Sequence, residues 1–317
     1  MRILAIDGGG IRGLVPAVVL ADLEARTGRR VADLFDLIAG TSTGGILACA
    51  LTRPANTGGG PAFTAADLIG LYESEGPEIF HRSLLVPVGE GESRAGDERY
   101  DDAGLVAALR RFLGAATLSQ TLTDVYVTAY EIEHRRTFAF RSSRARENPA
   151  HDFTLVDVAR ATAAAPTYFA PARVRDVAGE ATWALVDGGL YASNPALAAV
   201  ADAQAAGRGE VELVVSLGTG RPTRRVALEE AADWGRADWA RPILDMVFDG
   251  VAGTVDAQLS RLLPDGRYVR LQTRLDDASD DLDDAGDRNM EALRRIGTRL
   301  VEERAGDLDR IAAALTS

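Results

Sequence analysis

Lysine is absent from this chain of 317 residues, and all 35 of its basic residues are arginine. Without a lysine ammonium group the protein cannot form a lysine Schiff base, use a serine–lysine dyad or bind nucleotide through a Walker-type phosphate loop. The single cysteine, Cys49, excludes an internal disulfide framework and most thiolate metal sites. The preference for arginine over lysine, with abundant alanine, is typical of a GC-rich bacterial genome.

Positive charge is also scarce relative to negative charge, because 35 basic residues face 47 acidic ones and the net charge is −12. This balance argues against binding to a nucleic acid polymer and against adsorption to anionic lipid by charge alone. No apolar run approaches the roughly 18 to 20 residues that a membrane span needs. The N-terminal residues 1–6 also lack the features of a signal peptide. We therefore expect a cytoplasmic protein that is peripheral to a membrane when it acts there.

The pattern of apolar residues predicts strands that alternate with helices. Strands are expected at residues 2–6, 35–39, 124–132, 137–140, 183–186, 211–217 and 268–272. Helices are expected at residues 14–25, 44–51, 155–163 and 195–206, and mostly helical structure after residue 221. Such alternation implies an α/β protein with a mostly parallel sheet covered on both faces. In such sheets, binding sites gather where the carboxyl ends of strands meet helix N-termini.

The strongest local motif is Gly40-Thr-Ser42-Thr-Gly44, placed between an expected strand and an expected helix. A Gly-x-Ser-x-Gly sequence in this position allows a turn so tight that the serine hydroxyl is exposed at the helix N-terminus. The helix dipole and the unpaired amides there favour negative charge beside Ser42.

A second glycine turn, Asp7-Gly-Gly-Gly10-Ile-Arg12-Gly13, also lies between a strand and a helix. Consecutive glycines present backbone amides without obstruction, which suits a phosphate or an oxyanion. Residues 8–13 also match the Gly-x-Gly-x-x-Gly pattern of dinucleotide-binding proteins. That alternative requires an acidic residue about 20 positions later, at the end of the second strand. The second strand ends at Ser42 instead, and Asp7 would oppose a pyrophosphate.

A third turn, Asp187-Gly188-Gly189, follows the expected strand 183–186, and an isolated Asp-Gly pair is otherwise an ordinary turn. A serine hydrolase with a catalytic triad needs a histidine, but His81, His134 and His151 all fall in expected loops or turns. The remaining arrangement is a serine–aspartate pair in which a carboxylate takes the hydroxyl proton directly.

With these three turns, the sequence resembles the patatin-like phospholipase family. Residues 7–14 resemble the family's oxyanion loop, residues 40–45 its nucleophile elbow, and residues 187–189 its catalytic aspartate motif. Further matches lie at residues 161–169, 194–195 and 216–220, so the resemblance covers roughly residues 2–220. It implies a three-layer α/β/α fold, hydrolysis of lipid acyl esters, and no required metal or cofactor. We expect residues 1–220 to be the catalytic core and residues 221–317 a mostly helical C-terminal part of the same domain.

The resemblance assigns roles residue by residue. Ser42 would be the nucleophile and Asp187 the general base, with Gly188 and Gly189 completing the aspartate motif. Gly40 and Gly44 would shape the nucleophile elbow. The oxyanion hole would be formed by the glycine loop, which comprises Gly8, Gly9, Gly10, Arg12 and Gly13. Because a free aspartate has a pKa near ~3.9, Asp187 must be largely desolvated to act as a base.

Three further segments have functional alternatives. The acidic residues 276–287 begin like a calcium-binding EF-hand loop, but Ala285 and Ala292 stand where ligands are required, so we expect a solvated loop. The apolar residues 83–88 predict either core packing or a lid that contacts a membrane. The basic cluster of Arg135, Arg136, Arg141, Arg144 and Arg146 predicts a solvated edge or a site for a cyclic nucleotide activator, by analogy with some bacterial relatives in anti-phage defence.

The sequence thus predicts a phospholipase A-type acyl hydrolase that contacts a membrane surface transiently. The alternatives are a general esterase or triacylglycerol lipase with the same site, including a cyclic-nucleotide-activated effector that degrades membranes. The non-enzyme alternative is a nucleotide-binding module that uses residues 8–13.

Overall fold

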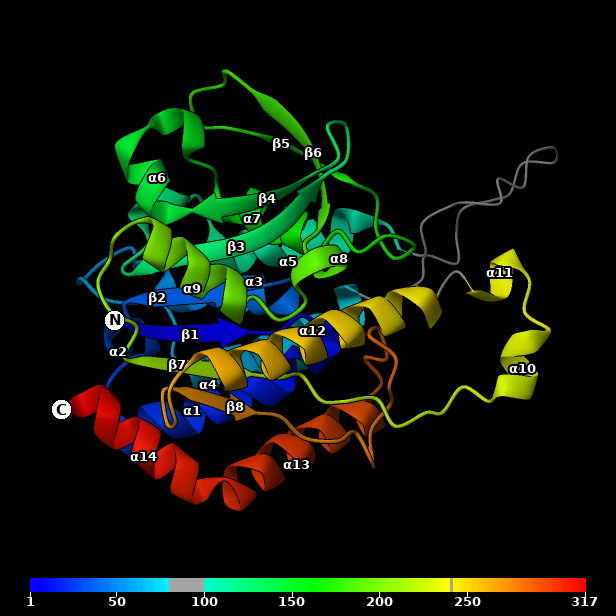
Figure 1. Cartoon of the computed structure of the whole chain (residues 1–317). Helices are drawn as coiled ribbons and strands as arrows, with labels where there is room; N and C mark the ends of the chain where they lie inside the picture. The colour runs from blue at the N-terminus through cyan, green and yellow to red at the C-terminus, as the bar shows by residue number, and fades with distance from the viewer. Residues whose placement is uncertain (80–99, 240–241) are drawn as a thin grey trace.

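A computed structural model describes residues 1–79, 100–239 and 242–317 (Figure 1). The strands are β1 (Arg2–Ile6), β2 (Leu37–Gly40), β3 (Asp124–Glu131), β4 (Arg136–Arg141), β5 (Ala172–Arg175), β6 (Thr182–Asp187), β7 (Leu213–Leu217) and β8 (Tyr268–Leu271). The α-helices are α1 (Leu14–Thr27), α2 (Val31–Leu34), α3 (Thr43–Thr52), α4 (Ala65–Ile79), α5 (Asp102–Leu113), α6 (Ser142–Glu147), α7 (Leu155–Thr162), α8 (Gly189–Ala192), α9 (Ala196–Ala205), α10 (Leu228–Ala232), α11 (Arg236–Trp239), α12 (Pro242–Leu262), α13 (Asp287–Glu303) and α14 (Ala305–Thr316). Short 3₁₀ turns lie at η1 (Gly10–Gly13), η2 (Leu118–Gln120) and η3 (Pro149–His151). His81 and the predicted lid segment 83–88 lie outside the described residues.

The strands form one sheet in the order β5-β6-β3-β2-β1-β7-β8, and β4 also pairs with β3. The run from β3 through β2, β1 and β7 to β8 is parallel. Around β3 the sheet becomes antiparallel, because β4 and β6 both run opposite to β3, and β5 opposite to β6. The expected mostly parallel sheet is therefore confirmed for its centre, and β4, β5 and β6 form an antiparallel part at one side of it.

Both faces of the sheet are buried, as the continuous apolar character of β1 requires. Leu4 and Ile6 contribute to the core on the face covered by α1, α3, α5 and α7. Ile3 and Ala5 point to the opposite face, where α9 and α12 cover a second core. Successive side chains of a strand point to opposite faces, so a strand buried on both needs helices on both sides. The result is the expected three-layer α/β/α arrangement.

The register of the parallel strands brings the glycine turns together at one edge. Ile6 at the end of β1 pairs with Gly40 at the end of β2, and on its other side with Leu217 at the end of β7. The loops that follow these three strands therefore leave the sheet side by side. This edge is where ligands bind in open α/β sheets.

The C-terminal part contributes directly to this fold. β8 extends the sheet beside β7, and α13 packs against α1. By contrast, α10 and α11 stand away from the body of the protein, on the side toward which β1 points (Figure 1). Among the described residues, no helix has the length and apolar character needed to cross a membrane. The boundary at residue 220 stays a prediction.

The expected elements occur, with shifts of one to three residues at most of their ends. The strand predicted at residues 35–39 begins at Leu37, because the chain first forms the short helix α2. Strand β5 was not predicted. Its sequence, Ala172-Arg-Val-Arg175, alternates buried and exposed residues over only four positions, too few for a clear strand signal.

Candidate active site

Ser42 stands on a strained turn between β2 and α3. Its backbone angles, φ 54° and ψ −124°, are unusual for a residue with a side chain. A Cβ atom on Gly40 would lie 2.2 Å from the carbonyl oxygen of Gly44, and one on Gly44 would lie 2.1 Å from that of Ile6. The strand and helix thus approach too closely for side chains at either glycine. The close approach holds Ser42 at the N-terminus of α3.

Hydrogen bonds from two other segments fix this turn. The amide of Ser42 donates to Oγ1 of Thr162, at the end of α7, over 2.8 Å. The hydroxyl of Thr41 donates to the carbonyl oxygen of Ala192 over 2.6 Å. Thr162 lies in the motif at residues 161–169, but sequence alone gave no sign that it binds the amide of Ser42.

Asp187 ends β6 and is completely buried. The amide of Gly189 donates to its Oδ1 over 2.7 Å, which fixes the carboxylate. Its Oδ2 is buried and has no hydrogen-bond partner within the described part of the chain. Desolvation raises the pKa of Asp187 from 3.8 to about 7, against smaller opposing effects of the Gly189 amide and the Ser42 hydroxyl. The carboxylate is therefore suited to accept a proton near neutral pH.

Ser42 and Asp187 line the same pocket, although they are 145 positions apart. The hydroxyl of Ser42 is near enough to lower the pKa of Asp187, although no regular hydrogen bond joins the two side chains. Catalytic hydrogen bonds are often long before substrate binds, so this spacing is compatible with proton transfer in a complex.

The glycine loop presents two unpaired amides to this pocket. The amide of Gly8 donates to Ser193 over 2.9 Å, and that of Ile11 to Leu282 over 2.8 Å. Between them, the amides of Gly9 and Gly10 have no acceptor among the described residues, and both glycines line the pocket. The left-handed φ of 57° at Gly10 favours glycine there, because residues with a Cβ rarely adopt it. Two adjacent donors of this kind can bind an oxyanion.

Arg12 and Gly13 stabilise the glycine loop through contacts outside the pocket, and Gly188 makes a similar close contact beside Asp187. Arg12 is buried, and its guanidinium donates to the carbonyl oxygens of Gly9 and Asp280. A Cβ atom on Gly13 would lie 2.2 Å from Oγ1 of Thr43, so this glycine allows η1 to pack against α3. Gly188 likewise packs against Thr128, where a Cβ atom would meet Oγ1 at 2.2 Å.

A buried ion pair anchors the start of the glycine loop. The guanidinium of Arg270 on β8 donates both to Oδ1 of Asp7, over 2.9 Å, and to Oδ2 of the same carboxylate. It also donates to the hydroxyl of Ser216 over 2.8 Å. Only 3% of the Asp7 side chain and 10% of the Arg270 side chain are exposed. This pair could not be predicted from the sequence, because Arg270 is separated from Asp7 by 263 positions and belongs to no motif.

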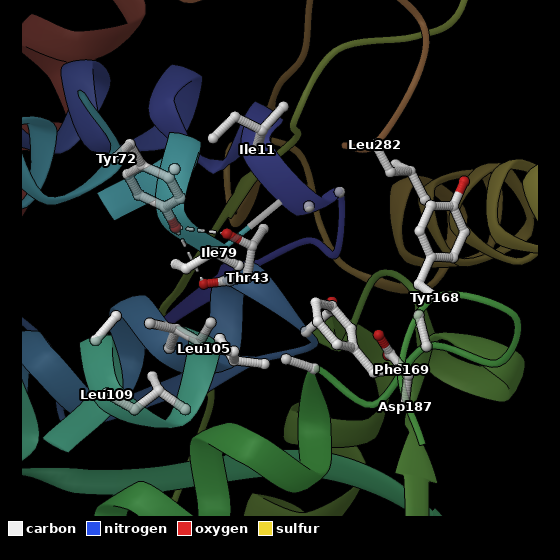
Figure 2. A pocket seen from close by; sticks show the side chains of 18 of the residues that line it. Ile11, Thr43, Tyr72, Ile79, Leu105, Leu109, Tyr168, Phe169, Asp187 and Leu282 are labelled. Atoms are coloured by element: carbon white, nitrogen blue, oxygen red, sulfur yellow. Dashed lines mark hydrogen bonds between the residues drawn. The ribbon is translucent and has the colours of Figure 1, made fainter. Parts of the chain in front are cut away.

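The pocket that holds Ser42 and Asp187 is lined mainly by apolar side chains (Figure 2). The wall comes from several elements, including α4, α5 and α12, and from the loop after β8. Its apolar members include Ile11, Leu71, Ile79, Leu105, Leu109, Phe169, Phe248 and Leu282. Tyr72, on α4, shares a hydrogen bond with the hydroxyl of Thr43, next to the turn that carries Ser42. An apolar chain attached to a polar reacting group fits such a lining.

The two described histidines lie elsewhere. His134, in the turn between β3 and β4, bonds to the buried carboxylate of Glu131. His151 is exposed in η3. Neither lines the pocket with Ser42. In the parts of the chain that the structure describes, no group of three or more His, Cys, Asp or Glu side chains is arranged to hold a metal ion.

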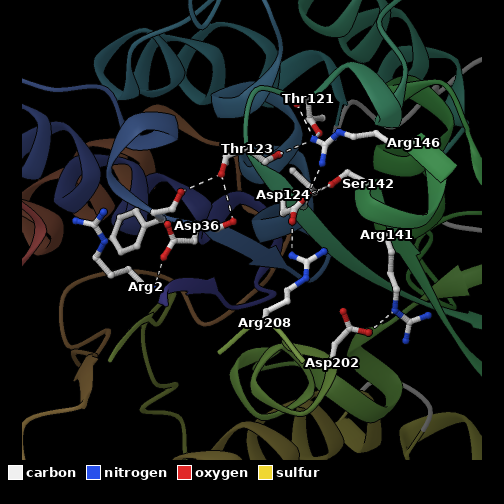
Figure 3. Close-up of polar contacts among 12 residues, drawn as sticks. Arg2, Asp36, Thr121, Thr123, Asp124, Arg141, Ser142, Arg146, Asp202 and Arg208 are labelled. Atoms are coloured by element: carbon white, nitrogen blue, oxygen red, sulfur yellow. Dashed lines mark hydrogen bonds and ion pairs between the residues drawn. The ribbon is translucent and has the colours of Figure 1, made fainter. Parts of the chain in front are cut away.

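The basic cluster at residues 135–146 is partly neutralised by carboxylates (Figure 3). Arg141 forms an ion pair with Asp202 at 2.5 Å. Arg146 and Arg208 contact the two oxygens of Asp124 from opposite sides. The other three arginines of the cluster are exposed, and the cyclic nucleotide site stays a prediction.

The acidic segment 276–287 is more than a solvated loop, so that expectation is wrong for its middle. Leu282 is 6% exposed and Asp283 is 7% exposed. The hydroxyl of Tyr100 donates to Asp283 over 2.7 Å. Leu282 supplies both a wall of the pocket and the acceptor for the Ile11 amide. The neighbours of Leu282 in the sequence are acidic, so the sequence indicated a solvent-exposed loop where Leu282 is in fact buried.

Comparison with known proteins places these residues in a family context. The family model described as "Patatin-like phospholipase" matches residues 4–200. "Patatin-like protein 2" of Arabidopsis thaliana is 36% identical over an alignment that covers 96% of this chain and 83% of that protein. "Patatin-04/09" of Solanum tuberosum is 32% identical over an alignment that covers 96% of this chain and 84% of that protein. Among solved structures, VipD from Legionella pneumophila matches with a TM-score of 0.36 at 12% identity, over 95% of this chain and 66% of that one.

Proposed function

This chain belongs to the patatin-like phospholipase family, and on that premise we propose that it is a serine acyl hydrolase that cleaves carboxylic ester bonds of phospholipids. One observation carries the proposal. Ser42, the buried Oδ2 of Asp187 and the unpaired amides of Gly9 and Gly10 all border one apolar pocket. These are the nucleophile, base and oxyanion donors that acyl transfer requires.

In the proposed reaction, the acyl chain lies along the apolar wall and its ester carbonyl reaches Ser42. The Ser42 oxygen bonds to the carbonyl carbon while its proton passes to Oδ2 of Asp187. The amides of Gly9 and Gly10 bind the oxygen that becomes negative, and such a donor contributes about 2.7–4 kcal/mol to transition-state stabilisation. Protonated Asp187 then donates to the alcohol that leaves. Water, deprotonated by Asp187, releases the fatty acid from the acyl-serine.

Covalent labelling tests the nucleophile directly. We expect a fluorophosphonate probe to label the wild-type protein at Ser42 and to leave Ser42→Ala unlabelled, because the probe reacts with an activated serine hydroxyl. Mass spectrometry of the labelled peptide identifies the site. Ser119 offers a matched control, since its hydroxyl also donates to a carboxylate, that of Asp152, but outside the pocket. Labelling that persists in Ser42→Ala would exclude the proposed nucleophile, and a nucleotide-binding module would not be labelled.

The substrate alternatives differ in the group that leaves. A phospholipase A releases fatty acid from phospholipid, a triacylglycerol lipase prefers a neutral glyceride, and a general esterase prefers short soluble esters. Comparing kcat/KM for these three substrates separates them. We expect phospholipid to be the best substrate when it is presented as vesicles.

The pH profile tests the base. Because Asp187 accepts a proton only when it is ionised, we expect kcat/KM for an uncharged short-chain ester to rise with pH through about 7 and to level off above it. Below that point the rate should fall about tenfold for each pH unit, since the ionised fraction falls in the same proportion. Initial rates between pH 5 and pH 9 give the profile. A rate that stays constant down to pH 5 would show that the base has an ordinary carboxylate pKa or is another group.

A further inference from the structure

Half of the exposed large apolar side chains in the described part of the chain lie in one short segment. Eight such side chains are more than a third exposed among the described residues, and four of them lie between residues 226 and 246. They are Val226 (40%), Leu228 (78%), Ile243 (50%) and Met246 (43%). A soluble protein rarely gathers exposed apolar side chains without using them for contact with a partner or a membrane.

These side chains lie in one short segment of the chain, and together with two tryptophans of that segment we call them the apolar tip. It comprises Val226, Leu228, Trp234, Trp239, Ile243 and Met246. Val226, Trp234 and Met246 line a single groove, together with charged side chains of both signs. Trp234 packs edge-on against Trp239, with ring centres 4.9 Å apart. The tip is formed by α10, α11 and the first turns of α12. Figure 1 shows α10 and α11 projecting beyond the body of the protein.

The apolar tip lies close to the proposed catalytic pocket along the chain. Met246 on α12 lines the groove, and Phe248, two residues later on the same helix, lines the pocket with Ser42 and Asp187. The loop after β8 makes the same connection, because Asp280 borders the groove and Leu282 borders the pocket. A lipid that leaves a bilayer in contact with the tip would therefore pass only a short distance before its ester reached Ser42.

The charge of this segment indicates what kind of surface it contacts. Residues 221–246 contain five arginines and five acidic residues, so their net charge is 5 − 5 = 0, in a chain whose net charge is −12. A surface with exposed apolar side chains and no net charge associates with lipid by insertion and gains little from anionic headgroups. Tryptophan side chains are also enriched at the boundary between a membrane and water. The occupant that fits is a bilayer of zwitterionic lipid.

We propose that the apolar tip inserts into the surface of a zwitterionic phospholipid bilayer and holds the catalytic pocket against it. The effect of this docking on catalysis rests on the proposed function, but vesicle binding itself does not require the protein to hydrolyse an ester. Only the apolar side chains of the tip enter the bilayer surface, and no segment of the tip crosses the bilayer. Affinity should therefore depend on Leu228 and Ile243, the two most exposed members of the tip, and hardly on ionic strength.

The test is vesicle binding in a form of the protein that cannot degrade the vesicles. The full chain with Ser42→Ala is mixed with phosphatidylcholine vesicles and separated by sedimentation. We expect the added changes Leu228→Asp and Ile243→Asp to lower the apparent affinity at least tenfold, because each places a charge where an apolar side chain enters the lipid. Leu262→Asp is the matched control, since Leu262 is 68% exposed but lies at the other end of the same helix α12. It should bind like the parent.

Activity measurements separate this inference from the proposed function. With Ser42 intact, the ratio of activity on vesicles to activity on a soluble short-chain ester should fall at least tenfold in the Leu228→Asp, Ile243→Asp variant and stay constant in Leu262→Asp. If the parent binds vesicles through the tip but hydrolyses no ester, the docking surface stands and the proposed function fails. Equal binding by the tip variant, the control and the parent would overturn the docking surface. So would a protein that is dimeric in solution and becomes monomeric when the tip is changed.

Discussion

Asp187→Asn is expected to lower kcat on a soluble ester by about 10³-fold or more, within the range that a general base contributes. The amide keeps the shape of the side chain and can still accept the hydrogen bond from Gly189. It cannot take the proton of Ser42, and no histidine among the described residues lines the pocket to replace it. Steady-state kinetics with short-chain esters measure the loss.

The same change should make the protein more stable at pH 8. The buried carboxylate has a pKa of about 7 in the folded protein, above its value of 3.8 in an exposed state. Its contribution to stability is therefore fully present below pH 3.8 and is lost as the pH rises through about 7, where the folded protein must hold a buried charge. Asparagine carries no such charge. We expect the stability difference to vanish near pH 4 and to reach a few kcal/mol at pH 8, since each unit of pKa shift corresponds to about 1.4 kcal/mol.

Asp176→Asn is the matched control, because Asp176 is also a buried aspartate but lies outside the pocket. Desolvation raises its pKa, but the amides of Glu180 and Ala181 donate to its carboxylate and more than offset this, so the net shift is downward. Its replacement should therefore reduce stability at neutral pH and leave esterase activity nearly unchanged. If Asp187→Asn kept more than a tenth of the wild-type kcat, Asp187 would be excluded as the base.

Arg270→Met is expected to lower the free energy of unfolding by about 3–5 kcal/mol, because it leaves the buried carboxylate of Asp7 without its partner. It should also lower kcat more than it raises KM, since Asp7 directly precedes the glycines that present the unpaired amides. Urea denaturation and ester hydrolysis measure the two effects. Adding Asp7→Asn should restore part of the stability by removing the unpaired charge.

Arg267→Met provides the comparison for Arg270→Met. Arg267 lies just before β8 and pairs with Glu210, whose side chain is 73% exposed. Exposed ion pairs contribute about 0–1 kcal/mol, so this change should have a small effect on both stability and activity. An equal effect of the two substitutions would show that the buried pair with Asp7 has no special role.

The sequence predicted the parts of the site that depend on backbone shape. The turns at residues 7–13, 40–44 and 187–189 need glycine at defined places, and such requirements are visible as motifs. The alternation of strands and helices then indicated that such turns meet at one sheet edge, and the register of β1 and β2 confirms this for the first two turns. Asp187 reaches the same edge from the antiparallel strand β6, where it pairs with Ala129, two residues beyond the partner of Gly40 on β3. The helices α1, α3, α7 and α9 were also predicted from the pattern of apolar residues, whereas α4 and α5 were not.

The sequence could not predict the contacts that join distant segments. Thr162, Leu282 and Arg270 support the site through one hydrogen bond or ion pair each, and nothing in their local sequence marks them. Leu282 was hidden by its acidic neighbours, whose charge indicated solvent exposure. Such positions are determined by packing in three dimensions, which overrides local composition.

The recognisable motifs end near residue 220, yet several supports of the glycine loop come from later in the chain. A polypeptide cut there would retain Ser42 and Asp187 but would lose the guanidinium that pairs with Asp7, the carbonyl that accepts from Ile11, and the phenyl ring of Phe248. The signature motifs alone are therefore not enough to build the complete pocket, which needs the last hundred residues as well.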